Sequence, residues 1–257
     1  MRHTLLRLTL ASAALLAAGS IARADTGRAR EPAVTCPAVA PTTLRLPRLR
    51  EAIAAGRPVV IAAIGSSSTF GAMAHDIGDS YPAELQQLLS AALPDAEISV
   101  INRGINGEDA GEEDARMRRD ALALGPQLVI WQVGANSAIR HESVKRFARL
   151  VRRGVDALTH AGVDVILMDN QRSRMVLAAP SNDRINAALA RIARESGVNL
   201  FSRDRLMREW AGGDAAPAAF LAKDGLHMND RGYACLARTL AGAILKAVAP
   251  PATQAGR

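Results

Sequence analysis

Short apolar runs alternate with segments of helical periodicity along most of this 257-residue sequence. The runs have the length of buried β-strands, and the segments between them repeat apolar residues every three or four positions. The five runs are residues 58–64, 96–101, 127–133, 163–168 and 198–201. Strands alternating with helices, with no internal repeat and no obvious linker, predict a single α/β domain with a mainly parallel five-stranded sheet covered by helices on both faces.

Helices are expected between these strands and after the last of them. The segment that follows Val144 is typical, because Phe147, Val151, Val155 and Leu158 form one apolar stripe. The other expected helices lie near residues 48–55, 81–93, 109–124 and 182–195 and at the C-terminal end after residue 227. Residues 169–180 are expected to form a loop.

The N-terminal segment has the pattern of a cleaved export signal. Arg2 and Arg7 precede an apolar stretch at residues 8–18, and Ala22 and Ala24 provide a small-residue cleavage site. The stretch is too short to span a bilayer, which argues against a membrane anchor. The predicted organisation is a signal peptide at 1–24, an N-terminal tail at 25–45, one domain at 46–249 and a disordered C-terminal tail at 250–257. The predicted location is periplasmic or secreted.

The net charge gives no reason to expect a nucleic-acid partner. The chain has 32 basic and 25 acidic residues, and removal of Arg2, Arg7 and Arg23 with the signal peptide leaves 29 − 25 = +4. One basic cluster interleaves with the apolar stripe after Val144 and is interpreted as the solvent face of that helix. Its members are Lys145, Arg146, Arg149, Arg152 and Arg153. Neither nucleic-acid binding nor stable membrane insertion is predicted.

Two cysteines, Cys36 and Cys235, remain in the mature chain. An exported protein matures in an oxidising compartment, so a disulfide between them is expected if the N-terminal tail wraps over the C-terminal helix. Such a bridge would contribute about 5 kcal/mol in the chain-entropy model. The alternative is that the two cysteines are unrelated free thiols. A thiol count on unreduced protein distinguishes a disulfide from two free thiols.

A candidate nucleophile lies where the first apolar run ends, in Gly65-Ser66-Ser67-Ser68-Thr69-Phe70-Gly71. A serine-rich turn that merely closes the strand is the structural alternative. In a parallel sheet, however, ligands bind beyond the carboxyl ends of the strands, and polar clusters near Gly107 and Asn136 follow two other strands. A serine nucleophile needs a general base, and His227 has Asp224 three residues before it to fix its tautomer.

Together, four ordered blocks resemble the SGNH, or GDSL-type, serine hydrolases: residues 65–71, 102–107, 134–136 and 224–227. The resemblance covers nearly the whole mature domain and implies a three-layer α/β/α, flavodoxin-like fold and carboxylic ester hydrolysis. It implies that Ser67 is the nucleophile, His227 the general base and acid, and Asp224 its orienting carboxylate. The backbone N–H groups of Ser67 and Gly107 and the side-chain amide of Asn136 would form the oxyanion hole. No metal or organic cofactor is implied.

The chain departs from the family pattern at two positions. Ser66 stands where the family has an aspartate before the nucleophile, and Ser137 stands where an aspartate often follows the oxyanion asparagine. These departures leave open how the loops are held, and Ser66 and Ser68 remain alternative reactive hydroxyls. His75, His141 and His160 are expected to be surface or packing residues.

The favoured substrate is a short acyl ester, in particular an O-acetyl group on a cell-envelope or extracellular glycan. Aromatic residues make up only 3% of the chain, so single sugar contacts from Phe70, Trp131 and Trp210 are expected rather than a long platform. The alternatives are an acyltransferase that uses the same Ser67 and a non-catalytic glycan-binding or scaffold protein. The sequence makes no prediction of oligomeric state.

Overall fold

The computed structural model describes residues 34–250. The predicted signal peptide at 1–24 and nearly all of the predicted C-terminal tail lie outside the described residues. None of the helices within 34–250 has both the length and the apolarity needed to cross a membrane.

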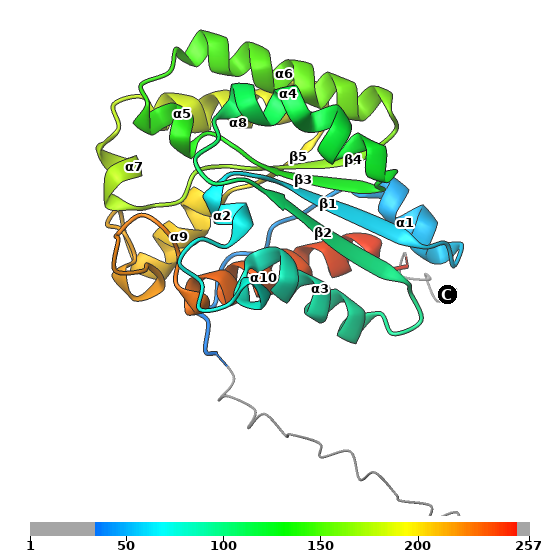
Figure 1. The fold of residues 1–257 in the computed structure, drawn as a ribbon. Helices are drawn as coiled ribbons and strands as arrows, with labels where there is room; N and C mark the ends of the chain where they lie inside the picture. The colour runs from blue at the N-terminus through cyan, green and yellow to red at the C-terminus, as the bar shows by residue number, and fades with distance from the viewer. Residues whose placement is uncertain (1–33, 251–257) are drawn as a thin grey trace, which may run out of the picture. The chain divides into compact units, whose positions relative to one another are not determined.

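The five predicted strands form one sheet in which every neighbouring pair is parallel (Figure 1). Its order is β2-β1-β3-β4-β5, which is the flavodoxin-like order. The strands are β1 (Val59–Gly65), β2 (Ile98–Gly104), β3 (Leu128–Gln132), β4 (Asp164–Met168) and β5 (Asn199–Phe201). The predicted fold class is therefore confirmed, and the sheet is parallel throughout.

Helices cover both faces of the sheet, as Figure 1 shows. One layer holds α1 (Pro47–Ala54), α3 (Tyr81–Ala92), α9 (Arg203–Ala211) and α10 (Asp230–Val248), and the other holds α4 (Ala110–Asp120), α6 (Val144–His160) and α8 (Asn182–Ser196). Successive side chains of a strand point to opposite faces, so Ile61 packs with the first layer and Ala62 with the second. Two apolar cores result, one on each side of the sheet.

Short helices follow the carboxyl ends of three strands and were not expected from the sequence. They are α2 (Ser67–Phe70) after β1, α5 (Ala135–Ile139) after β3 and α7 (Arg174–Ala178) after β4. The expected loop at 169–180 contains α7 because Ser173 caps it, its Oγ accepting the Val176 N–H. The described part of the chain also holds three 3₁₀ turns: η1 (Ile77–Asp79), η2 (Leu122–Leu124) and η3 (Ala218–Phe220).

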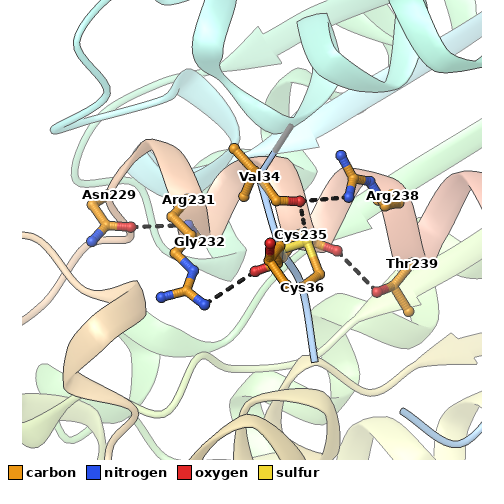
Figure 2. The surroundings of a disulfide bond; sticks show 9 residues. Val34, Cys36, Asn229, Arg231, Gly232, Cys235, Arg238 and Thr239 are labelled. Atoms are coloured by element: carbon orange, nitrogen blue, oxygen red, sulfur yellow. Dashed lines mark hydrogen bonds between the residues drawn. A yellow bond between two sulfur atoms is a disulfide. The ribbon is translucent and has the colours of Figure 1, made fainter. Parts of the chain in front are cut away.

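The segment before α1 packs on the domain although it has no helix or strand. Its residues Leu44 and Leu46 are buried in the core of the first layer. A disulfide joins Cys36 to Cys235 on α10, with the two Cα atoms 5.5 Å apart (Figure 2). Beside it, the Arg238 guanidinium donates to the Val34 carbonyl at 2.7 Å. The segment from residue 34 is therefore fastened along the outer side of α10.

Candidate active site

The nucleophile turn, residues 65–71, bends sharply between β1 and α2. A Cβ on Gly65 would lie 2.4 Å from Thr69 Oγ1 and 2.8 Å from the Gln132 carbonyl oxygen, so only glycine fits there. Ser67 is the first residue of α2 and is partly exposed, whereas Ser66 and Ser68 are buried. Of the three serines, Ser67 is therefore the one that the turn presents to solvent.

Three side chains form a hydrogen-bonded line at the carboxyl edge of the sheet. The Ser67 Oγ lies 2.8 Å from His227 Nε2, and His227 Nδ1 lies 2.6 Å from Asp224 Oδ2. Ser67 and His227 are 160 residues apart in sequence, so the contact depends on the folded sheet and the docked α10. An imidazole between a hydroxyl and a carboxylate can accept the hydroxyl proton and return it later.

A tight loop, residues 224–227, fixes the carboxylate under the imidazole. Asp224 Oδ1 accepts the backbone N–H of Leu226 at 2.9 Å and that of His227 at 3.0 Å, while Oδ2 faces the imidazole. Gly225 has a φ of 66°, which turns the backbone back within one residue. Partial burial alone would raise the pKa of Asp224, but the hydrogen bonds from His227 and from the two backbone N–H groups outweigh it and hold the pKa below its usual value. Asp224 is therefore ionised at neutral pH.

The loop after β2 adjoins the nucleophile turn. The Ile105 N–H donates to the Gly65 carbonyl at 3.0 Å, and the Asn136 amide on α5 donates to the Glu108 carbonyl at 2.7 Å. This bond uses one of the two amide hydrogens of Asn136 and leaves the second available. Within residues 34–250, the backbone N–H groups of Ser67 and Gly107 donate to no acceptor. Three donors predicted for the oxyanion hole thus keep a hydrogen for a ligand.

Arg140, at the end of α5, holds the same loop and was missed by sequence reasoning. Its Nη2 donates to the Gly107 carbonyl at 2.7 Å, and its Nη1 lies 3.0 Å from Asp109 Oδ2 and 3.2 Å from Glu112 Oε2. Asn136 and Arg140 lie one turn apart, so one short helix fastens the loop at two neighbouring carbonyls. A lone arginine in a loop region carries no sequence signal for such a contact.

The sequence profile of the non-GDSL lipase-like family matches residues 33–250. The chain belongs to that family. A comparison with curated proteins found no match. The lipase-like description of this family agrees with the ester hydrolysis predicted from the sequence, and the solved structures below share the fold.

Solved structures of esterases share the fold of this non-GDSL lipase-like protein at low identity. A two-domain esterase active on acetylated mannans superposes with a TM-score of 0.68 at 22% identity, covering 84% of this chain and 58% of the esterase. An acetylxylan esterase, Axe2 from Geobacillus stearothermophilus, superposes with a TM-score of 0.59 at 20% identity, covering 77% of this chain and 97% of Axe2. A protein from Desulfitobacterium hafniense DCB-2, described as lipolytic and of the G-D-S-L family, superposes with a TM-score of 0.61 at 20% identity. The match covers 72% of this chain and 99% of that protein. This chain therefore spans under two thirds of the mannan esterase.

In this family member, Ser66 and Ser137 form hydrogen bonds that hold the loops of the candidate site. The Oε1 of Gln132 accepts from the Ser66 backbone N–H at 3.2 Å, from the Ser66 hydroxyl at 3.3 Å and from the Thr69 hydroxyl at 3.2 Å. The Ser137 hydroxyl accepts the Ala110 N–H at 3.4 Å. A buried glutamine at the end of β3 thus stabilises the nucleophile turn in a chain that lacks the aspartate. In the sequence, the only indication of this role is that Gln132 is a polar residue at the end of an apolar strand.

The aromatic contacts expected for a sugar are mostly wrong for this non-GDSL lipase-like protein. Trp131 is fully buried, and its indole N–H donates to Glu113 Oε2 at 2.8 Å. Trp210 is buried and stacks on Phe220 with ring centroids 4.6 Å apart. Both side chains belong to the apolar cores, Trp131 on β3 and Trp210 on the inner face of α9. Phe70 is 41% exposed beside Ser67 and stays a candidate contact.

Within residues 34–250, the other histidines form no hydrogen bond with Ser67, His227 or Asp224. His75, His141 and His160 are all exposed. Among residues 34–250, no group of three or more His, Cys, Asp or Glu side chains is arranged to hold a metal ion.

Proposed function

We propose that this chain is an exported serine ester hydrolase that removes short acyl groups, in particular acetyl groups, from a cell-envelope or extracellular glycan. The observation that carries the proposal is the hydrogen-bonded line from Ser67 through His227 to Asp224. Membership of a lipase-like family supports ester hydrolysis, and the esterases of acetylated mannan and xylan among the structural neighbours support a glycan ester.

The reaction follows from the geometry. The Ser67 Oγ attacks the ester carbonyl while His227 Nε2 takes the hydroxyl proton, and Asp224 stabilises the imidazolium that forms. The carbonyl oxygen becomes an oxyanion, held by the N–H groups of Ser67 and Gly107 and the amide of Asn136, each worth about 3 kcal/mol in the transition state. The C–O bond to the sugar then breaks, and His227 returns the proton to the departing sugar oxygen.

Water completes the cycle. His227 takes a proton from a water molecule that attacks the acyl-serine; the second tetrahedral intermediate then collapses with cleavage of the C–Oγ bond, His227 returns the proton to Ser67 Oγ, and the carboxylic acid leaves. The side chain of His227 is 15% exposed and that of Asp224 is 33% exposed, so solvent reaches the site. Water can therefore reach the acyl-serine, as hydrolysis requires.

The test is labelling of the purified protein with a fluorophosphonate probe, followed by turnover of nitrophenyl esters of increasing chain length. We expect labelling of the wild type, none in Ser67→Ala, and a loss of at least 100-fold in labelling rate in His227→Ala. Ser90→Ala and His160→Ala are the matched controls, because both residues lie on helices away from the site and should leave labelling unchanged. Turnover should be highest on acetate.

Two results would contradict the proposal. Folded wild-type protein that does not label would leave only a binding or scaffold role. Labelling accompanied by acetylated sugar products, with no free acetate above background, would identify an acyltransferase.

A further inference from the structure

A cavity of about 460 Å³ lies against the loop that carries the candidate base. Gly225, which lies between Asp224 and His227 in the sequence, forms part of its wall. Residues of α7 and of the connection from α9 to α10 form the rest. Figure 1 shows that connection, coloured orange, beside α7 at the carboxyl edge of the sheet. The small side chains of Ala215, Ala216 and Ala218 face the cavity and leave its interior open. We refer to it as the Arg174 cavity.

Two cationic side chains line this cavity, Arg174 on α7 and Lys223 directly before Asp224. The Arg174 guanidinium covers Gly225, since a Cβ there would lie 3.4 Å from Nη2 and 3.7 Å from Nε. Within residues 34–250, neither cation forms an ion pair or a side-chain hydrogen bond with the protein. Both keep their donors for a ligand.

None of the residues that line the cavity is acidic, and the carboxylates of the adjoining segments already have partners. Asp224 is bound by the His227 imidazole and by two backbone N–H groups. Asp214 pairs with Arg208 at 3.1 Å, and Asp204 pairs with Arg172 at 2.8 Å. Within residues 34–250 no carboxylate forms an ion pair with Arg174 or Lys223, and these two cations outnumber the ionised Asp224 beside them, which gives the cavity a net positive potential.

The wall of the cavity is held in place before any ligand arrives. Arg172, whose side chain is 5% exposed, donates through Nη2 to the backbone carbonyl of Asp214 in the connection from α9 to α10. Its own backbone N–H faces Met207 Sδ at 3.3 Å. A preformed cavity costs less ordering on binding than a loop that must close.

The position of the cavity determines which part of a substrate it meets. His227 must protonate the departing sugar oxygen, so the sugar lies on the side of His227, and the Arg174 cavity adjoins that loop. We propose that the cavity binds an anionic substituent of the glycan, a carboxylate or a phosphate on the acylated sugar or its neighbour. This inference rests on the proposed function for its geometry and adds the substrate class: an acidic acylated glycan. The guanidinium fork of Arg174 and the point charge of Lys223 both suit such a group.

The experiment measures binding of unacylated oligosaccharides by calorimetry at low salt, so that it needs no catalysis. The probes are tetragalacturonate for a carboxylate, a phosphorylated mannotetraose for a phosphate and xylotetraose as the neutral sugar. We expect one of the two acidic probes to bind at least tenfold more tightly than xylotetraose. Arg174→Ala and Lys223→Ala should each weaken that binding about tenfold, the size of a charge-assisted hydrogen bond. Added salt should weaken it as well.

Arg149→Ala is the matched control, because Arg149 is an exposed arginine on α6 in the opposite helix layer. It removes the same charge and should leave all binding unchanged. Equal binding of acidic and neutral probes, or equal losses in Arg149→Ala and Arg174→Ala, would overturn the proposal. A wild type that binds the acidic probe but fails to label with fluorophosphonate would contradict the proposed function while leaving the cavity assignment standing.

Discussion

Arg140 and Gln132 show how much of the candidate site depends on side chains outside the line of Ser67, His227 and Asp224. Arg140 holds the Gly107 carbonyl, and Gln132 gathers three hydrogen bonds at the nucleophile turn. Both connect parts of the chain that are far apart in sequence. They position the proposed oxyanion donors and the proposed nucleophile, so the effects of replacing them should be seen in the rate of the chemical step.

Arg140→Ala should therefore lower kcat on a nitrophenyl acetate about tenfold with little change in KM, because the proposed oxyanion donor at Gly107 loses its anchor while the groups that would contact the rest of the ester are unchanged. Arg140→Lys should recover only part of kcat, since one ammonium cannot replace both guanidinium contacts. Steady-state kinetics measure both values. A rise in KM with kcat unchanged would show that Arg140 acts on binding instead.

Asp169 gives a prediction on pH. Burial raises its pKa to about 6, although the Ser202 hydroxyl, the Asp204 N–H and the charge of Arg203 act to lower it. The folded protein thus holds this proton more tightly than the unfolded chain, where the pKa is about 3.9. The contribution of Asp169 to the free energy of unfolding should fall by up to about 3 kcal/mol as the pH rises from 4 to above 6.

Urea unfolding of wild type and Asp169→Asn at several pH values between 4 and 8 measures this contribution. As the pH rises, the free energy of unfolding of Asp169→Asn should increase relative to that of the wild type. A difference that does not change with pH would show that folding leaves the pKa of Asp169 unshifted.

At the scale of elements, α2 and the end of β2 meet without any space between their backbones. A Cβ on Gly104 would lie 2.0 Å from the Phe70 backbone nitrogen, a contact that only backbone movement can relieve. The close approach brings the loop after β2 to the nucleophile turn, where the Ile105 N–H donates to the Gly65 carbonyl. The position of the two loops relative to each other thus depends on a glycine.

Gly104→Ala should destabilise the protein by more than 2 kcal/mol and lower esterase activity, since α2 or β2 must shift. Gly242→Ala in α10 is the matched control: a Cβ there meets nothing within 4 Å, and alanine should stabilise the helix by up to about 1 kcal/mol. Thermal unfolding compares the two. A Gly104→Ala protein as stable and active as the control would mean that the two loops can move apart freely.

The elements also show what sequence reasoning can and cannot reach. The strands and long helices were predictable because burial imposes a period on the apolar residues. α9 was missed because its apolar face has only Leu206, Met207 and Trp210 among many charges. Ser67 and His227 could be named from local pattern and family resemblance, whereas Arg140, Gln132 and the Arg174 cavity arise from contacts between distant segments. No local pattern encodes such contacts.

At the scale of the whole molecule, the disulfide fastens the segment before α1 to the outer side of α10. It closes a loop with a sequence separation of 199 residues. In the chain-entropy model a loop of this length restricts the unfolded chain by about 5 kcal/mol. The stabilisation therefore acts on the domain as a whole rather than on the site alone.

Replacement of both cysteines, Cys36→Ser with Cys235→Ser, should lower the free energy of unfolding by about 2 to 5 kcal/mol. Urea unfolding with and without reductant measures the effect: reductant should destabilise the wild type and leave the double variant unchanged. A thiol count on unreduced protein is the control. Two free thiols, or a wild type insensitive to reductant, would contradict the role of the bridge.

The same covalent loop has a consequence for damage to the chain. Ser67, Gly107, Asn136, Asp224 and His227 all lie between the two cysteines in sequence. A protease that cuts a surface loop once anywhere in this interval produces two pieces that remain joined through sulfur. In an environment rich in proteases, nicked molecules would keep both halves of the candidate triad together, and only a second cut or a reductant would separate them.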